Sequence, residues 1–324
     1  MTSLENFWYK LNQTKHEKEY FFSSIIILIA LLVSAIFLKG YVFYGKSQVL
    51  YSYKVETKQT AQTKQSTHVY HDIHALKGFS KISAGTKLTV LGYDAIKHHN
   101  QKELFAKVKV DGQTLYVMAK AITLKQSNAI NRYIANLGYP KVSPKQDIYS
   151  KFKKEAYHTQ SKQPKGIVIH DTGTENSTLA GEKANMENDY RDQGVFVHSF
   201  IDDKEILTIA NPNYMAQGAG PKANPYYLQF EMVHVYQKKA FAKQIANAAY
   251  YTALMLNKYN LGITLGQKNG QGTVWTHEMV SEDLGGTNHI DPSQYWEDSA
   301  SQFFQTDYDV ENFVQLVQAY YNRL

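Results

Sequence analysis

Two histidines stand at the ends of short apolar segments that have the composition of buried strands. His170 follows residues 166–169 (GIVI) and precedes a turn-forming Asp-Thr-Gly sequence, and His277 follows residues 274–276 (VWT) in the same way. A polar side chain at the end of a buried strand emerges at the rim of its sheet. There it can make a structural hydrogen bond or bind a metal ion, and for each histidine taken alone both interpretations stay open.

A third cluster supplies residue types that suit a metal site. His289 and Asp291 are two positions apart, so in extended backbone their side chains point to one side. The chain contains no cysteine, which excludes thiolate ligands, disulfides and cysteine nucleophiles. Two separated histidines with a carboxylate would form a three-ligand catalytic zinc set that leaves the fourth position to water.

Glu231 interrupts an otherwise apolar strand, residues 228–233 (LQFEMV). A carboxylate in such a strand costs free energy unless it is paired or takes part in chemistry. The alternative is a salt-bridged surface residue on the polar strand face that Glu231 shares with Gln229. The order strand-His, strand-Glu, strand-His and His-x-Asp-Pro is more specific than any of these signals alone.

The elements that must position these residues alternate between strands and helices. Strands are expected at 166–170, 195–201, 228–233 and 274–277. Apolar residues recur at helical spacing from 241 to 259, and a last helix is expected from about 307. Strands interleaved with long helices predict an α/β sandwich around a central sheet.

Composition limits the classes to which the protein can belong. The 324 residues are 43% hydrophobic, which excludes a wholly disordered chain, and the net charge is +6. Only three residues are arginine, and because arginine grips phosphates and base edges bidentately, we expect no nucleic-acid partner.

One segment, residues 21–38, is apolar throughout, and the next charge is Lys39. As a helix its 18 residues span about 27 Å, enough for a hydrocarbon core. A cleaved signal peptide is the alternative, but its apolar region is usually shorter and no small-x-small cleavage site follows. We therefore expect an uncleaved single-pass anchor that leaves the short N-terminal arm inside the cell and the long remainder outside.

Between the anchor and the α/β block the pattern changes twice. Residues 56–66 show no apolar periodicity and are interpreted as a solvated spacer, whereas 68–124 contain short β runs and an Asp-Gly hairpin signal at 111–112. This β region is similar to small bacterial SH3-like barrels, and a wall-binding module and a rigid spacer are equally open interpretations. A helix at 129–137 and a basic segment at 151–165 follow; the basic segment is a solvated face or helps attract anionic wall polymers.

The α/β block resembles a known family, the zinc-dependent N-acetylmuramoyl-L-alanine amidases with the phage-lysozyme and peptidoglycan-recognition-protein fold. About 160 residues, roughly half of the chain, show the family's motifs in order. These are IVIHDTG (167–173), VHSFID (197–202), LQFE (228–231), THEMV (276–280) and HIDP (289–292). The resemblance implies a central mixed β-sheet flanked by helices.

The resemblance also implies roles for individual residues. Zinc would be held by His170, His277 and Asp291, with Glu231 as general base and His289 stabilising the oxyanion. Two departures affect the expected shape of the substrate groove. Asp171 stands where many relatives have a second histidine, and QGAG (217–220) replaces a frequent His-Ala-Gly loop. His198 lies in a family motif but is expected to be structural.

The implied activity is hydrolysis of the amide between N-acetylmuramic acid and L-alanine in peptidoglycan, on the wall side of the cell membrane. The alternative is a non-catalytic peptidoglycan-binding protein, and a zinc peptidase is disfavoured because no His-Glu-x-x-His motif is present. The expected organisation is a cytoplasmic arm (1–20), an anchor (21–38), a linker (39–66), an SH3-like barrel (67–125), a helical and basic connector (126–164) and an amidase domain (165–324).

Overall fold

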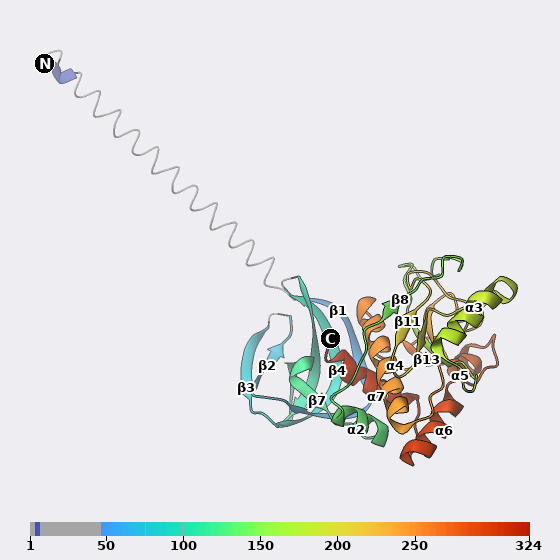
Figure 1. Cartoon of the computed structure of the whole chain (residues 1–324). Helices are drawn as coiled ribbons and strands as arrows, with labels where there is room; N and C mark the ends of the chain where they lie inside the picture. Colours follow the sequence, from blue (N-terminus) through green and yellow to red (C-terminus); the bar gives the residue numbers. More distant parts are fainter. Residues whose placement is uncertain (1–3, 7–46, 75, 99) are drawn as a thin grey trace.

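The computed structural model describes residues 4–6, 47–74, 76–98 and 100–324, which form two β-sheets with helices between and around them (Figure 1). The expected anchor, residues 21–38, lies outside these ranges and stays a prediction. None of the helices within the described ranges has the length and apolar character needed to cross a bilayer.

The N-terminal sheet has seven antiparallel strands in the order β3-β2-β6-β5-β4-β1-β7. Its strands are β1 (Gln48–Thr63), β2 (Thr67–Asp72), β3 (Lys77–Ile82), β4 (Lys87–His98), β5 (Gln101–Val110), β6 (Gln113–Met118) and β7 (Ile122–Leu124). The expected hairpin is confirmed: Asp111 and Gly112, both with positive φ, connect β5 to β6. The likeness of this sheet to SH3-like barrels stays a prediction.

The expectation of a solvated spacer at residues 56–66 is wrong, because most of that segment belongs to β1, which pairs with β4 and β7. Gln59, Ala61 and Thr63 alternate along the buried face. Two of these three are polar and are satisfied by hydrogen bonds: the Tyr93 hydroxyl donates to Gln59, and the Thr63 hydroxyl donates to the carbonyl of Ser83. Buried and exposed side chains therefore alternate along this strand, but the buried ones are mostly polar and form no apolar pattern in the sequence.

The second sheet is mixed and has six strands in the order β13-β9-β12-β10-β11-β8, as the family resemblance implied. The first four are parallel to one another, whereas β11 is antiparallel to β10. Its strands are β8 (Lys145–Gln146), β9 (Gly166–Asp171), β10 (Ser199–Ile201), β11 (Ile206–Thr208), β12 (Tyr227–Met232) and β13 (Val274–Thr276). Because β8 lies in this sheet and Phe152 stacks on Phe196, the segment expected to be a connector packs into the C-terminal part of the chain.

Helices cover this sheet and fill the space between it and the N-terminal sheet (Figure 1). The expected helices at 129–137, 241–259 and after 307 are confirmed as α2 (Ala129–Asn136), α4 (Lys238–Lys258) and α7 (Val310–Tyr321). Two further helices, α3 (Leu179–Gln193) and α6 (Ser293–Phe304), were not predicted. In α3 only Leu179 is buried, so this helix lacks the apolar stripe on which such predictions rest.

The two sheets share one hydrophobic core, which joins them through α7. Tyr53 of β1 donates a hydrogen bond to Oε1 of Gln318 over 3.1 Å, and the hydroxyls of Tyr51 and Tyr321 are hydrogen-bonded to each other. A continuous core with buried polar contacts predicts that both parts unfold in one cooperative transition.

Gly262 allows the close contact between the two parts, and we expect Gly262→Ala to lower the free energy of unfolding by about 1–3 kcal/mol. A Cβ at this position would lie 2.5 Å from Cδ1 of Tyr53. The ring cannot easily move, since it stacks on Tyr93 and its hydroxyl is bonded to Gln318. Urea unfolding measures the effect. The double variant Gly262→Ala/Tyr53→Ala should lose less free energy of unfolding than the sum of the losses in the two single variants. Additive losses would show that the clash does not occur.

Candidate active site

The carboxyl ends of parallel strands bring the two strand-end histidines together. His170 is the penultimate residue of β9, and His277 follows β13, in which Thr276 pairs with Ile169 of β9. His277 begins the short helix α5 (His277–Met279), which continues into a helical turn, η2 (Val280–Leu284). The Nδ1 atoms of the two buried histidines are 2.9 Å apart.

Asp291 joins the histidines from the loop that precedes α6. Its Oδ2 lies 3.3 Å from Nδ1 of His170, and its Oδ1 lies 3.1 Å from Nδ1 of His277. The backbone supports this placement, because the amide N–H of Asp171 donates to Oδ2 of Asp291 and the carbonyl of Asp291 accepts from Glu278. The three side chains form a cluster that could hold a metal ion.

The environment of the cluster favours an ionised carboxylate at Asp291. Burial acts to raise the pKa of Asp291, but hydrogen bonds and charge interactions with His170 and His277 outweigh it and hold that pKa well below its usual range. Burial lowers the pKa of His170. The second nitrogen of His277, Nε2, lies 3.0 Å from the hydroxyl oxygen of Thr287, which fixes the orientation of the ring.

Glu231 lies beside this cluster on β12, where it pairs with His170 across the sheet. Its Oε2 is buried and has no hydrogen-bond partner among the described residues. Glu231 forms no ion pair within the described ranges, so the salt-bridged surface alternative is wrong. Burial raises the pKa of Glu231 well above its usual value, and the charges of Asp291 and Asp171 raise it further.

The raised pKa makes a prediction for the metal-free protein. An ordinary glutamate has a pKa of about 4.5. Above that pH, Glu231 has lost its proton in the unfolded chain but keeps it in the folded chain. The free energy of unfolding therefore falls as pH rises towards the folded pKa. In chelator at neutral pH, Glu231→Gln should be more stable than the wild type by about 1–3 kcal/mol, and the difference should vanish below about pH 4. Urea unfolding across this range measures it; a constant difference would contradict the raised pKa.

His289 lies at the edge of the cluster, with its side chain 64% exposed. Its ring stacks on that of His277, with centroids 4.6 Å apart and planes 7° from parallel. Its Nδ1 lies 3.6 Å from Oδ1 of Asp291, close enough for electrostatic contact but not for a good hydrogen bond. The imidazole thus faces solvent next to the possible metal position.

All five expected site residues line one cleft of about 910 Å³. The two departures from the family pattern also line it, since Asp171 and the 217–220 loop contribute to its wall. Other lining residues come from the end of α3 and the residues after it (Gln193, Val195), from the turn before β12 (Asn224) and from the loop before α6 (Thr287, Asn288 and Ile290). The cleft is large enough for a ligand of several chemical groups.

The residues that hold Asp171 were not predicted from the sequence. His234 donates from Nε2 to Oδ1 of Asp171 over 2.6 Å, and its ring stacks on Tyr295 at 4.0 Å with nearly parallel planes. The hydroxyl of Tyr295 donates to Gln244 and accepts the backbone N–H of Val235. A signal was present, because His234 follows the apolar strand 228–233 as His170 and His277 follow theirs.

His198 is structural, as expected. It is fully buried; its Nδ1 accepts the backbone N–H of Gln229, and its Nε2 donates to the carbonyl of Tyr214. Burial lowers its pKa to about 4, so the ring is neutral at physiological pH. It fixes the loop after β11 rather than lining the cleft.

Comparisons with known proteins agree with this geometry. A family model described as N-acetylmuramoyl-L-alanine amidase matches residues 160–294. A bifunctional autolysin of Staphylococcus epidermidis is 41% identical over 175 residues, which are 53% of this chain and 13% of the autolysin. The bifunctional autolysin of Staphylococcus aureus is 39% identical over 194 residues, 59% of this chain and 15% of the autolysin. The chain thus spans less than a sixth of the length of these relatives.

The solved structure of a staphylococcal hydrolase is similar to this chain over nearly its whole length. The Staphylococcus aureus hydrolase AmiA, crystallised with its ligand, is 35% identical, with a TM-score of 0.56. The match covers 61% of this chain and 92% of that chain, and it agrees with the mixed α/β fold described above. Together with the family match over the residues that build the cleft, this similarity shows that the chain belongs to the N-acetylmuramoyl-L-alanine amidase family.

Proposed function

We propose that this chain hydrolyses the amide bond between N-acetylmuramic acid and L-alanine in peptidoglycan, with one zinc ion held by His170, His277 and Asp291. The observation that carries the proposal is the convergence of two histidines and an aspartate next to Oε2 of Glu231, which is buried and has no partner among the described residues. Membership of the amidase family supports the same activity.

The donor set fits zinc. Ligands about 2.0–2.1 Å from a tetrahedral ion stand about 3.3 Å apart. In the cluster the two Nδ1 atoms are 2.9 Å apart, and they lie 3.3 Å and 3.1 Å from Oδ2 and Oδ1 of Asp291, respectively. Nitrogen and carboxylate donors suit this ion, and the contact of His277 with Thr287 is the kind of outer hydrogen bond that orients such ligands. A bound zinc ion would supply Lewis-acid chemistry, acidifying water and polarising the scissile carbonyl.

The residues of the chain would move the protons. Oε2 of Glu231 is free to accept a proton from the attacking water, and the same carboxyl would later donate it to the leaving amine. Its raised pKa suits this exchange, since a carboxyl that titrates nearer to neutral pH is a better proton donor. His289, exposed at the edge of the cluster, would donate a hydrogen bond to the carbonyl oxygen as it gains negative charge.

The location that we propose follows from the sequence. An apolar segment at 21–38 supports a single-pass membrane anchor, with the cleft on the wall side beside peptidoglycan. The N-terminal sheet, in the interpretation as an SH3-like module, would lie between the membrane and the amidase part.

Incubating the full chain with purified peptidoglycan tests the activity. We expect new L-alanine amino termini to appear and to disappear when chelator is added, with no new reducing ends from the glycan. Because only cleavage at the lactyl amide frees this amino group, the product identifies the bond. Other amino termini would indicate a peptidase, and binding without release of peptides would support the non-catalytic alternative.

A further inference from the structure

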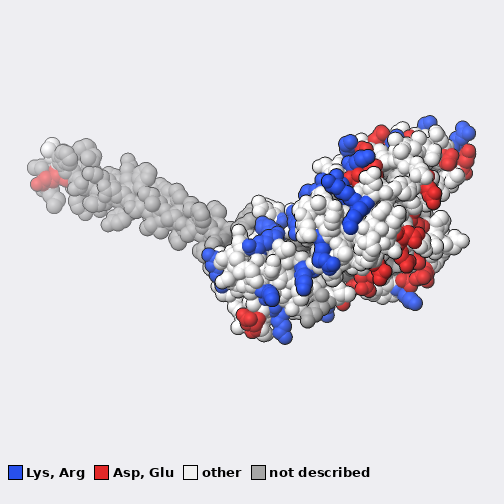
Figure 2. All heavy atoms as spheres, turned by 60° about the horizontal axis from the view of Figure 1, so that its bottom comes forward, with Lys and Arg blue, Asp and Glu red and all other residues white. Residues whose placement is uncertain are grey.

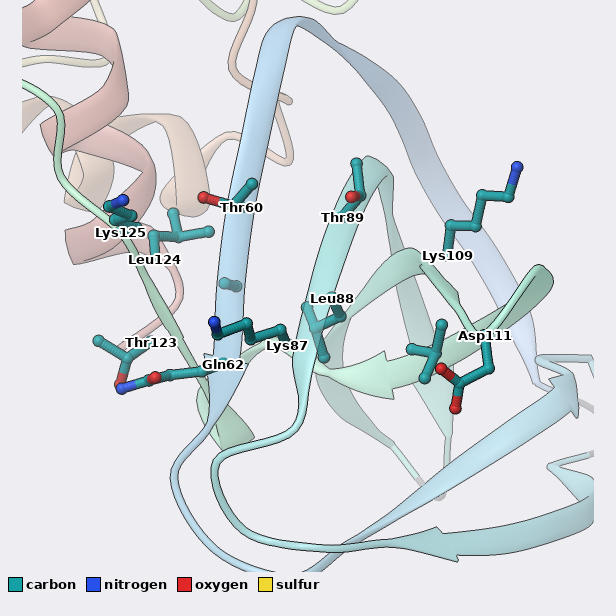
Figure 3. Close-up of a pocket in the computed structure, with 12 residues that line it drawn as sticks. Thr60, Gln62, Lys87, Leu88, Thr89, Lys109, Asp111, Thr123, Leu124 and Lys125 are labelled. Atoms are coloured by element: carbon teal, nitrogen blue, oxygen red, sulfur yellow. The ribbon is translucent and has the colours of Figure 1, made fainter.

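A second hollow lies on the N-terminal sheet, away from the residues of the cleft. It has a volume of about 590 Å³, and its twelve lining residues come from four neighbouring strands, β5-β4-β1-β7, and the residues that follow β5 and β7 (Figure 3). We call it the lysine pocket. At about 4.8 Å between strands, the pocket extends over about 14 Å. It is thus wide enough for an extended chain lying across the strands.

Three exposed lysines distribute positive charge along this pocket. Figure 3 shows Lys125 at one end, Lys109 at the other and Lys87 between them, extending towards β1. None of the three forms an ion pair within the described part of the chain, and Asp111 is the one acidic residue of the lining. Unpaired charges spaced along a hollow suit a ligand with several negative groups rather than a single anion.

The same charge bias holds for the whole N-terminal sheet. Residues 47–125 contain twelve lysines against five acidic residues, whereas residues 126–324 contain 18 basic and 21 acidic residues. Figure 2 shows that most acidic side chains visible from that side lie over the C-terminal part, while Lys and Arg extend over the N-terminal sheet. Within residues 47–324, the excess of positive charge therefore lies in the sheet that carries the pocket, whereas the part of the chain that forms the cleft has a small excess of negative charge.

The neutral groups of the lysine pocket narrow the class of ligand. In-register pairs place Thr60 opposite Thr89, and Gln62 between Lys87 and Thr123, so hydroxyl and amide groups alternate with the lysines. None of its twelve described residues is aromatic or arginine, which argues against stacked bases. Hydroxyls and amides hydrogen-bond well to polyols.

We propose that the lysine pocket binds an anionic polyol polymer, in which phosphodiester or carboxylate groups alternate with hydroxyl groups. The polymer would lie across β5, β4, β1 and β7, its charges at the three lysines and its hydroxyls at the threonines and Gln62. This site is separate from the amidase cleft, and its occupancy does not depend on the proposed hydrolysis. Because the two sheets share one core, a polymer held here would fix the orientation of the cleft as well.

Binding of poly(glycerol phosphate) to the full chain tests the proposal. We expect the wild type to bind this polymer, more weakly as salt increases, and not to bind neutral dextran. The variant Lys87→Gln/Lys109→Gln/Lys125→Gln should bind at least about tenfold more weakly. The control Lys81→Gln/Lys97→Gln/Lys120→Gln changes the net charge equally but alters lysines outside the pocket, so it should lose less than about threefold.

The outcomes separate the proposal from its rivals. Equal losses in the two triple variants would mean that overall charge, and not the pocket, binds the polymer. Tighter binding of poly(dT) than of poly(glycerol phosphate) would point to nucleic acid, and no binding of either would also overturn the proposal. Both variants should have the melting temperature of the wild type, which shows that loss of the folded structure does not explain weaker binding. A loss confined to the pocket variant supports the site.

Discussion

Glu231→Gln is expected to lower the rate of amide hydrolysis by about 10²- to 10⁴-fold while leaving about one zinc ion per chain. Glutamine keeps the size of the side chain but can neither accept the proton of the attacking water nor donate it to the leaving amine. Since Glu231 is not among the three convergent donor residues, the metal content should not change. Release of L-alanine amino termini and metal analysis of the same preparation measure both effects.

Glu182→Gln is a matched control for this experiment. Glu182 also has a buried carboxylate oxygen without a partner among the described residues, but it is not among the residues that line the cleft. Its replacement should change the rate by less than about threefold, as expected for a group that handles no proton of the reaction. If Glu231→Gln kept more than a tenth of the wild-type rate, the assignment of Glu231 as general base would be wrong.

The part of the site that was predictable from sequence is the part built by parallel strands. Such strands place their carboxyl ends at one edge of a sheet, so the strand-end residues His170, Glu231 and His277 had to meet once their strands were recognised. The spacing of His289 and Asp291 indicated a shared side of the chain, but only the fold shows that their loop reaches Nδ1 of both histidines.

The features that could not be predicted from the sequence depend on buried polar side chains whose hydrogen-bond partners are distant in the sequence. Gln59 and Thr63 face inward in β1 because hydrogen bonds from and to distant residues satisfy them, so an apolar pattern could not reveal the strand. Likewise, Asp171 and His234 are 63 residues apart, and their contact depends on the pairing of β9 with β12. Local sequence indicates a strand end but not the partner that it meets.

Because the proposed metal site is formed by only three side chains from separate segments of the chain, a single substitution should be enough to weaken zinc binding. His170→Ala and Asp291→Ala should each reduce the zinc content from about one ion per chain to well below one, because two remaining ligands bind zinc far more weakly than three. For the wild type, zinc at 100 times its dissociation constant should add about 2.7 kcal/mol to the free energy of unfolding. Neither variant should show that gain.

Metal analysis after dialysis, and urea unfolding with and without zinc, measure these effects independently of activity. His158→Ala is a suitable control, because His158 is exposed, contacts Tyr226 and lies outside the cluster. It should retain both the zinc and the zinc-dependent stability. Full zinc content in both His170→Ala and Asp291→Ala would show that the ion binds elsewhere. Loss in both, with retention in His158→Ala, would place it where the three donor atoms converge.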